Sequence, residues 1–477
     1  MTTPLTTTKG LPDTVEAPGY DRASLRPGIF HLGPGAFMRA HLAAYTDTAI
    51  AHAGGDWGIE TAGLRSRDTV DILSAQNGLY TLLVRDAEAT QARVVGSIVA
   101  AHPPSAILAR LVDPAIRIVS LTLTEKAYPR DAATGDLDAG HPDVAADLAE
   151  PDNPRSAGGL IVEALARRRA AGIAPFTPLS CDNLPENGAV LRRLVVGFAA
   201  LRDSDLAAWI DANVPFPSTM VDRITPASTD TTYADAQHLT GRQDKAAVET
   251  EPFAQWVIED RFASGRPDWE AAGALMVADV SPYEKMKLRM LNGTHSLVAY
   301  LGFVAGHEFM RDAMADPAIA AAARAHLACA AATLDPVPGV DLSPYADDLA
   351  ARIANRAIAH RTYQIAMDGT QKLPPRIFEP AAEMLESGGE WRPFARATAA
   401  WMRYALGVDA QGTPYALRDP RETDIAAALA QTPRTADTIA AALIDLPGLF
   451  PQPLRASPDW RREVATRLDE LLRGGAG

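Results

Sequence analysis

The sequence is poor in cysteine. Its 477 residues include only Cys181 and Cys329, which form no CxxC pair and no spacing typical of a metal site. Two cysteines in a chain of this length do not make a disulfide framework, so we expect reduced thiols and a cytoplasmic protein. We predict no bound metal.

Long apolar runs and an excess of positive charge are also missing. No stretch of about 18 uninterrupted apolar residues suggests a membrane span, and the N-terminal segment lacks the apolar core of a signal peptide. Against 45 Lys and Arg stand 59 Asp and Glu, a formal net charge of −14. This balance argues against nucleic acid and against anionic membrane as partners. It is compatible with an anionic small substrate, because a pocket can hold cations that the total hides.

The pattern of predicted secondary structure changes along the sequence. Residues 1–27 are rich in Thr, Pro and Gly and predict an irregular lead-in. Strand-like runs alternate with helical patterns over residues 28–280, and Ala-rich helical segments dominate residues 281–477. A strand, a glycine turn, a helix and a strand in sequence imply a parallel sheet. We therefore predict an α/β domain followed by a mainly α-helical domain.

The individual elements are predicted from period and composition. The expected strands of the first domain lie at 28–32, 57–64, 80–84, 93–98, 116–124, 174–182 and 218–225, the last two as later strands of one sheet. The expected helices lie at 36–54, 157–171, 188–213, 297–332, 345–367, 391–407, 422–443 and 458–473.

The segment HLGPGAF follows a predicted strand and opens a predicted helix. Gly33 and Gly35 fit the first two glycines of a dinucleotide fingerprint, but Met38 stands at the third position. Glycines let a backbone approach a pyrophosphate at a helix start. The pattern predicts either a dinucleotide site or a plain tight turn. The expected cofactor-binding residues here are Gly33, Gly35, Ala36, Phe37 and Arg39.

An acidic residue that binds the ribose hydroxyls belongs near the end of the second strand. Asp68 is the candidate, with Glu60 less well placed, and Asp68 alternatively caps a helix. Arg65 and Arg67 lie beside it in the sequence, and arginine at this position often accompanies a cofactor that carries a 2′-phosphate. The expected cofactor is therefore NAD, with NADP left open by Arg67.

Polar side chains also stand at the ends of three further predicted strands. Thr124 is the last residue of the strand at 116–124 and Glu125 follows it. Asp182 is the last residue of 174–182 and Asn183 follows it, and Asp222 lies within 218–225. Ligands of open α/β sheets bind at the carboxyl ends of strands. These side chains are therefore predicted to face ligands, and loop capping is the alternative for each segment.

The segment SPYEKMKLRMLNGTHSLVAYLGF is the richest in polar groups. On a continuous helix at about 100° per residue, Lys287, Asn292 and His295 share one side within an arc of about 140°. An amine, an amide and an imidazole there suggest carbonyl chemistry, in which the amine moves the hydroxyl proton and the others polarise the oxygen. A solvated helix face is the alternative, and Asn292-Gly293 is typical of a helix end.

Read together, these segments resemble the polyol-specific long-chain dehydrogenase family, the mannitol 2-dehydrogenase group. The matching motifs run in order from about residue 28 to 412: HLGPGAFMRAH, VSLTLTEKAY, SCDNLPENG, FPSTMVDRITPAST, EPFAQWVIEDRF, GRPDWE, PYEKMKLRMLNGTHS, MDGTQKLPPR and WMRYALGVDAQG. The resemblance implies an N-terminal Rossmann-type domain, a helical C-terminal domain and an active site between them. It also implies metal-independent hydride transfer with a nicotinamide cofactor, in a monomer.

The resemblance implies a role for each catalytic candidate. Lys287 would be the general acid or base, and Glu284 would connect it to solvent. Asn292 and Asn183 would stabilise alkoxide character at the reacting oxygen. His295 would hydrogen-bond substrate hydroxyls.

It implies binding roles as well. Asp222 and Lys372 would lie in or beside the substrate site, and Asp68 would bind the adenosine ribose. Arg67 replaces the acidic neighbour seen in mannitol dehydrogenases, which bears on cofactor preference. Thr124 and Glu125 would contact the cofactor.

Within the family, HRTYQIAMDGTQKLPPR resembles fructuronate reductases, because Gln364 stands where mannitol dehydrogenases have arginine. The implied reaction interconverts D-fructuronate and D-mannonate. A carboxylate on the substrate favours local cations. Arg289, Arg361 and Lys372 are the candidates, with structural ion pairs as the alternative for the two arginines. A neutral polyol enzyme (D-mannitol/D-fructose or D-arabinitol/D-xylulose) and an inactive nucleotide-binding sensor are the other hypotheses.

Overall fold

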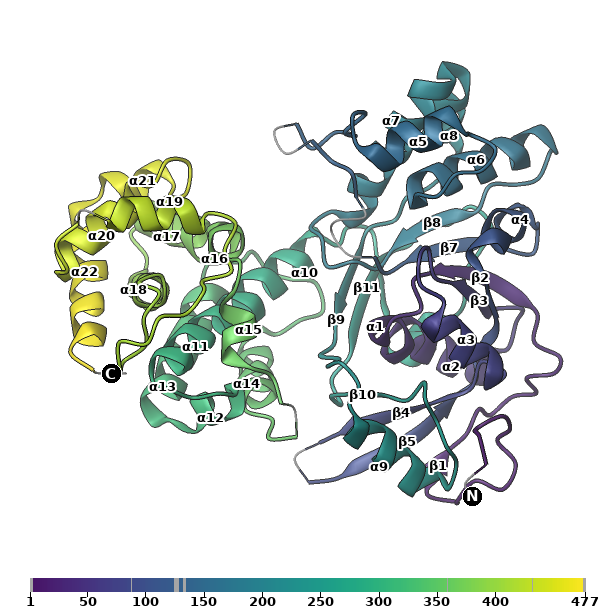
Figure 1. Ribbon diagram of the computed structural model, residues 1–477, viewed down its shortest axis with the longest axis horizontal. Coiled ribbons are helices and arrows are strands. Elements are labelled where there is room, and N and C mark those ends of the chain that lie inside the picture. The colour runs from purple at the N-terminus through teal and green to yellow at the C-terminus, as the bar shows by residue number, and fades with distance from the viewer. Residues whose placement is uncertain are drawn as a thin grey trace. The chain divides into compact units, whose positions relative to one another are not determined.

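The computed structural model, drawn in Figure 1, describes residues 3–86, 88–123, 128–131, 134–357, 359–430 and 432–474. The chain divides into unit 1, Met1–Ser281, and unit 2, Pro282–Gly477.

A five-stranded parallel sheet organises unit 1. Its order in space is β6 (Ile98–His102), β3 (Gly58–Ala62), β2 (Pro27–Leu32), β7 (Ile118–Leu121) and β8 (Thr177–Ser180). Numbered along the chain, this order is 3-2-1-4-5, the doubly wound arrangement of a Rossmann-type fold. The predicted fold class is therefore confirmed for the first part of the chain.

Helices cover both faces of this sheet, which explains its continuous apolar strands. Phe30 and Leu32 of β2 pack into a core with α4 (Ile107–Val112), α6 (Ala157–Ala170) and α7 (Asn187–Arg202), while Ile29, the residue before Phe30, packs with α2 (Leu42–Ala53) on the other face. Side chains alternate across a strand, so a strand covered on both faces is mostly apolar, and a polar residue within it, such as His31, is buried and hydrogen-bonded. The helices of unit 1 are α1 (Ala36–Ala40), α2 (Leu42–Ala53), α3 (Asp68–Ala75), α4 (Ile107–Val112), α5 (Pro142–Ala149), α6 (Ala157–Ala170), α7 (Asn187–Arg202), α8 (Ser204–Asn213), α9 (Asp230–Thr240) and the 3-10 helices η1 (Pro104–Ala106) and η3 (Trp269–Ala272).

The predicted continuation of the parallel sheet into 218–225 is wrong. There β9 (Thr219–Asp222) pairs antiparallel with β11 (Gln255–Glu259), which pairs in turn with β12 (Leu275–Val277). The pattern of apolar residues predicts an extended segment but not its partner, because the partner is chosen by hydrogen bonds to a distant part of the chain.

A further sheet contains β1 (Val15–Glu16), β5 (Thr90–Val95), β4 (Tyr80–Arg85) and β10 (Val248–Thr250). The lead-in, predicted to be irregular, thus contributes a short strand. The predicted strand 93–98 is divided between β5 and β6 in different sheets. Gly96 lies at the division, where a Cβ would come within 2.6 Å of the Pro18 side chain, so the chain turns where only glycine fits.

Helices are the regular secondary structure of unit 2 in its described residues, as predicted, and extended backbone occurs there only as isolated bridges. Helix α11 contacts α12, α13, α15 and α18 and is buried along most of its length. The predicted helix 297–332 is divided, because Asp316 caps a new helix that begins at Pro317. The elements are α10 (Ser281–Met286), η4 (Lys287–Asn292), α11 (Gly293–Val304), α12 (Met310–Ala315), α13 (Pro317–Ala331), α14 (Leu342–Ile353), α15 (Thr362–Ala366), α16 (Gly369–Leu373), η5 (Pro374–Phe378), α17 (Glu379–Ser387), α18 (Arg392–Tyr404), α19 (Glu422–Leu429), α20 (Ala436–Ile444), α21 (Gln452–Ala456) and α22 (Pro458–Leu472).

Among the helices in the described ranges, none combines the length and the apolar content that a membrane crossing requires.

Candidate active site

The central strands of the parallel sheet end together at one edge. Leu32, the last residue of β2, is in register with Ala62 of β3 and Leu121 of β7, and Leu121 is in register with Ser180 of β8. The chain order reverses between β2 and β7, and ligands of such sheets bind outside the carboxyl ends at that point. The turn after β2 and the segment after β8 therefore start from the position where a ligand is expected.

Gly33 and Gly35 shape the turn after β2 in different ways. Gly33 has φ +95°, and a Cβ there would lie 2.6 Å from the Thr122 carbonyl oxygen, so neither its conformation nor its surroundings accept a side chain. A Cβ on Gly35 would meet nothing closer than the Gly33 carbonyl oxygen at 3.9 Å. The backbone at Gly35 thus faces open space, which fits the close approach of a pyrophosphate.

The residues after the turn divide between surface and interior. Ala36 and Phe37 open α1 and are half-buried, and the Phe37 ring stacks on His41 at 4.9 Å. Arg39 is only 8% exposed and donates hydrogen bonds to the carbonyls of Gly35 and Ala246. The Arg39 guanidinium therefore makes its hydrogen bonds inside unit 1 and is not presented on the surface of the turn.

Asp68 is exposed at the start of α3 and accepts a hydrogen bond from the Ser66 hydroxyl at 3.1 Å. The alternative that Asp68 caps this helix is wrong, because Arg67 is the cap residue and Asp68 is the first helical residue. Arg67 lies 3.4 Å from Asp71 in an exposed ion pair.

Glu60, the second acidic candidate, is buried within β3 and bonded to Arg110 at 2.7 Å and to His102 at 3.2 Å. Burial alone would raise its pKa, but these hydrogen bonds hold the pKa below the usual range. Glu60 and Arg110 therefore form a structural ion pair. The expected cofactor contacts Thr124 and Glu125 follow β7 but lie outside the described residues.

A buried amide, which sequence reasoning missed, joins the tips of β8 and β9. Asn187 donates from Nδ2 to the carbonyls of Asp182 at 3.0 Å and Thr219 at 2.8 Å, and its Oδ1 accepts from the Thr219 amide at 2.9 Å. The Asp182 carbonyl belongs to the peptide bond of the exposed Asn183, and Thr219 opens the strand that ends at the buried Asp222. The available signal was the SCDNLPENG motif, in which Asn187 stands four residues after Asn183.

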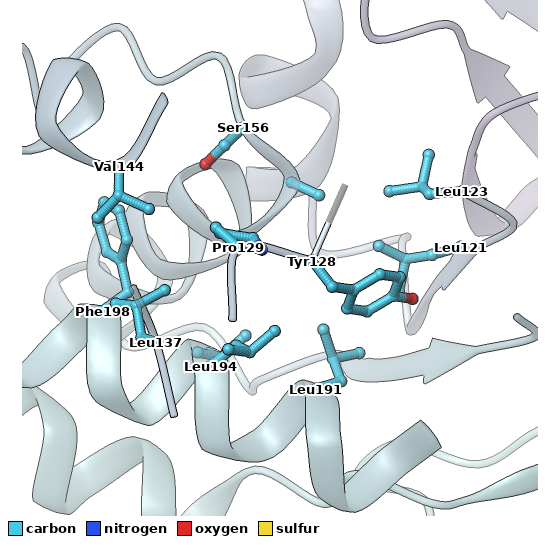
Figure 2. A pocket seen from close by; sticks show the side chains of 13 residues that line it. Leu121, Leu123, Tyr128, Pro129, Leu137, Val144, Ser156, Leu191, Leu194 and Phe198 are labelled. Atoms are coloured by element: carbon cyan, nitrogen blue, oxygen red, sulfur yellow. The ribbon is translucent and has the colours of Figure 1, made fainter. Parts of the chain in front are cut away.

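Tyr128 supports the same segment from the other side. Its hydroxyl donates to Asp182 and lies 2.9 Å from the Ser180 hydroxyl. Figure 2 shows an apolar pocket next to this tyrosine, lined in part by Leu191 and Leu194 of α7. Its cavity of about 20 Å³ has room for about one water molecule, so it is a packing gap and not a sugar or cofactor site.

In unit 2, α10, η4 and α11 follow one another without a break from Ser281 to Val304, so the expectation that Asn292-Gly293 ends a helix is wrong. The middle part, η4, is a π-helix, in which the Gly293 amide bonds to the Leu288 carbonyl five residues earlier. In an α-helix, Lys287 and Asn292 would be separated by about 140° around the helix axis. The wider turn of the π-helix reduces this angle, so the two residues lie more nearly one above the other. π-Helical turns often occur at functional sites.

The His295 imidazole lies beside a second histidine ring. Its ring centroid lies 5.9 Å from that of His360, edge to face. Burial lowers the pKa of His295 well below its usual value, and the nearby His360, Arg352, Arg376 and Lys287 act in the same direction. The ring contact with His360, and the hydrogen bond of Arg376 to Ser296, the next residue in the chain, place these two side chains near the imidazole.

Sequence reasoning found only part of this cluster. Lys287 was predicted and is 9% exposed, but Arg352, Arg376 and His360 were missed. His360 and Arg376 are the first and last residues of HRTYQIAMDGTQKLPPR, so this motif was the available signal for both. Arg376 donates to the Ser296 hydroxyl at 3.3 Å.

Lys372 stands beside this cluster. Its ammonium donates to the Met367 carbonyl at 2.7 Å and lies 3.5 Å from Asp368. Burial lowers the pKa of His360, and Lys372 contributes to the same effect. Glu284 is half-buried in α10, one turn before Lys287.

Two expected carboxylate-binding cations are in ion pairs, the alternative that the sequence left open. Arg289 is 4% exposed and donates to both carboxylate oxygens of Glu383, whose pKa this bond lowers. Arg361 pairs with Glu308 in an exposed position. Gln364 of α15 is exposed.

Among the described residues, no group of three or more His, Cys, Asp or Glu side chains could hold a metal ion. Both cysteines are buried, and burial raises the pKa of each thiol.

Comparison with known proteins covers both units. Residues 27–271 match the family described as the mannitol dehydrogenase Rossmann domain, and residues 279–472 match the mannitol dehydrogenase C-terminal domain. The chain is 45% identical to the D-mannonate oxidoreductase of Escherichia coli K12 over 97% of this chain and 96% of that protein. It is 44% identical to YeiQ, an uncharacterized oxidoreductase of the same organism, over 98% and 96%. The structure of Pseudomonas fluorescens mannitol 2-dehydrogenase with NAD and D-mannitol is similar with a TM-score of 0.85 and 38% identity, over 100% of this chain and 98% of that one.

Proposed function

The chain belongs to the mannitol dehydrogenase family, and on this premise we propose that it is an NAD-dependent oxidoreductase that interconverts D-fructuronate and D-mannonate. The observation that carries the substrate is the Arg376 guanidinium, which donates to the Ser296 hydroxyl next to His295 in the chain, together with Arg352 and Lys287, whose charges act with it on the pKa of His295. A uronate differs from a neutral ketose by a carboxylate, and guanidinium groups bind carboxylates with strong, often bidentate hydrogen bonds. The similarity to a D-mannonate oxidoreductase supports the same substrate.

We assign the cofactor to the edge of the parallel sheet in unit 1. Gly33 and Gly35 would let the backbone approach the pyrophosphate, and the exposed Asp68 would bind the adenosine ribose. When bound, NAD supplies the nicotinamide carbon that takes up or returns the hydride. Thr124 and Glu125, which follow β7 in the sequence, are assigned to the cofactor as well, as the family resemblance implies.

The proton of the reacting hydroxyl goes to Lys287 in the oxidation direction and comes from it in the reduction direction. Asn292 would donate an amide hydrogen bond to the oxygen as it gains negative charge, and Asn183 is assigned the same role. His295 is neutral at pH 7, because its pKa is far below the usual value, so it offers one donor and one acceptor nitrogen to substrate hydroxyls. Glu284 would pass protons between Lys287 and solvent.

A neutral polyol dehydrogenase is the second candidate. Arg289 and Arg361, two cations expected to bind a carboxylate, are paired with Glu383 and Glu308 instead. The similarity to a mannitol 2-dehydrogenase structure is consistent with this alternative.

Steady-state kinetics of NADH oxidation with D-fructuronate and with D-fructose tests the proposal. We expect a higher kcat/KM for fructuronate, and we expect Arg376→Gln to raise the KM for fructuronate about tenfold or more with a smaller effect on fructose. Arg392→Gln, which changes an exposed arginine paired with Glu390, is the matched control. A preference for fructose would favour the neutral polyol enzyme, and NADH binding without turnover of any sugar would favour the sensor.

A further inference from the structure

His326 is a buried imidazole to which the proposed chemistry assigns no part. It lies in α13 with no exposed surface, and its Nδ1 is 3.0 Å from the hydroxyl of Thr294. Thr294 stands in the chain between Asn292 and His295, two residues with proposed roles at the reacting oxygen and at substrate hydroxyls. A residue of one helix thus contacts the chain between two functional positions of another.

The ring also fills the space next to Gly293. A Cβ on Gly293 would lie 2.8 Å from Cε1 of His326 and 3.1 Å from the Arg376 carbonyl oxygen. Phe394 meets the imidazole edge to face at a centroid distance of 5.1 Å and holds it from another side. The glycine of the NGTH sequence is therefore required by close packing, since no larger residue fits between the imidazole and the backbone of η5.

This contact falls where the helix changes type. The π-turn η4 ends at Asn292, and α11 begins at Gly293. π-Helical turns are rare and short, so the surroundings must favour them over a continuous α-helix. If η4 relaxed to α-helix, the residues after it would rotate by about 100° for each residue of shift, and His295 would turn away from its place relative to Lys287.

We propose that His326 is a positioning residue: its bond to Thr294 and its packing on Gly293 hold the junction of η4 and α11, and thereby the relative placement of Asn292 and His295. This inference rests on the roles proposed for those two residues. Burial lowers the pKa of His326 to about 3, so the imidazole is neutral at pH 7 and acts through its shape and one hydrogen bond. Its Nε2 has no hydrogen-bond partner among the described residues, so Thr294 supplies the bond that the buried ring requires.

The test compares Thr294→Val, His326→Gln and His326→Asn in the full chain with NADH and D-fructuronate, or with D-fructose if that is the better substrate. We expect Thr294→Val and His326→Gln to lower kcat about tenfold to a hundredfold, with the KM for NADH unchanged within about twofold. His326→Asn restores kcat to within about threefold of wild type, because the asparagine amide reaches the position of Nδ1, which the glutamine amide overshoots. Thr240→Val removes a buried helical threonine hydroxyl in unit 1 and is the control, with unchanged kcat.

A lower melting temperature with normal kcat in Thr294→Val and His326→Gln would show that the contact only stabilises unit 2 and would overturn the inference. If the histidine variants fail to fold, Thr294→Val decides alone, because it removes one hydroxyl and keeps the side-chain volume. Asn292→Ala distinguishes a failure of the proposed chemistry from a failure of the inference about His326. If it keeps full turnover, the proposed chemistry and this inference both fail, and if it is inactive while Thr294→Val is normal, only the inference fails.

Discussion

Unit 1 and unit 2 hold their candidate residues by different means. In unit 1, the neutral amide of Asn187 joins the Asp182 carbonyl, which precedes Asn183, to Thr219, the first residue of the strand that ends at Asp222. In unit 2, Lys287 and His295 lie on the continuous run of α10, η4 and α11. Charged side chains from other segments lower the pKa of His295. One unit places polar groups by strand pairing, and the other places charges by helix packing.

The difference teaches which unit should be sensitive to which change. A satisfied network of neutral groups is rigid and contributes to stability, whereas it carries no charge to bind a carboxylate or move a proton. A cluster of cations is costly to bring together and is useful where a negative charge must be bound or formed. Unit 1 variants should therefore affect folding and cofactor binding, and unit 2 variants should affect turnover.

The largest expected effect is that of Lys287→Ala, which should lower kcat by a factor of about 10² to 10⁴, because it removes the group that moves the proton. The dissociation constant of NADH, measured by nicotinamide fluorescence, should not change if the cofactor belongs to unit 1. Lys285→Ala, two residues earlier on the same helix, should retain turnover. Loss of NADH binding in Lys287→Ala would break the division of labour between the units.

Asn187→Ala should lower the free energy of unfolding by about 2–4 kcal/mol, because it leaves two carbonyls and one amide of the strand tips without their partner. Urea titration measures the change. Asn213→Ala is the matched control, since this exposed asparagine makes one bond, to the Trp209 carbonyl, and should change stability by less than about 0.5 kcal/mol. Equal effects of the two substitutions would contradict a supporting network at the strand tips.

The two glycines of the turn should separate folding from cofactor binding. Gly33→Ala should lower stability by about 1–3 kcal/mol, because φ is +95° and the new Cβ would strike the Thr122 carbonyl. Gly35→Ala should keep the melting temperature and weaken NADH binding about tenfold, because its Cβ would occupy the open space above the turn. Unchanged NADH affinity in Gly35→Ala would remove the turn from the cofactor site.

The smallest expected effect near neutral pH is the change in the free energy of unfolding with pH that is caused by a buried histidine in each unit. Burial lowers the pKa of His31 in unit 1 and of His326 in unit 2 to about 3. The unfolded chain, with a histidine pKa near 6.5, then binds protons that the folded chain does not, so this stability is complete above pH 6.5 and is lost as the pH falls from 6.5 toward 3. The loss is up to about 1.4 kcal/mol per pH unit for each histidine. His31→Asn and His326→Asn should each flatten the fall in stability measured by urea titration between pH 7 and 5, and an unchanged slope would contradict this origin.

Much of unit 1 could be predicted because its signals are local. The apolar strand of β2, the glycine turn and the following helix are contiguous, and the Rossmann-type sheet that they predict is confirmed. The pairing of β9 could not be predicted, since its partner β11 lies more than thirty residues later and has no special pattern. Asn187 was missed because a buried polar residue is recognisable only once its partners are known.

Unit 2 shows the opposite balance. Its helices and the trio Lys287, Asn292 and His295 could be predicted from spacing and motif. The π-turn that alters their arrangement could not, because hydrogen bonds of i→i+5 leave no periodic trace in six residues. Of the predicted cations, Arg289 and Arg361 have acidic partners that their own segments do not reveal.

The sequence by itself determined the family and the fold class, because these depend on motifs within short stretches of chain. The tertiary structure decided which charges are used in ion pairs, which surround His295, and how the helix that holds Lys287 is wound. The physical reason is that a side chain's charge, burial and hydrogen bonds depend on neighbours brought from distant positions, and local sequence does not specify those neighbours.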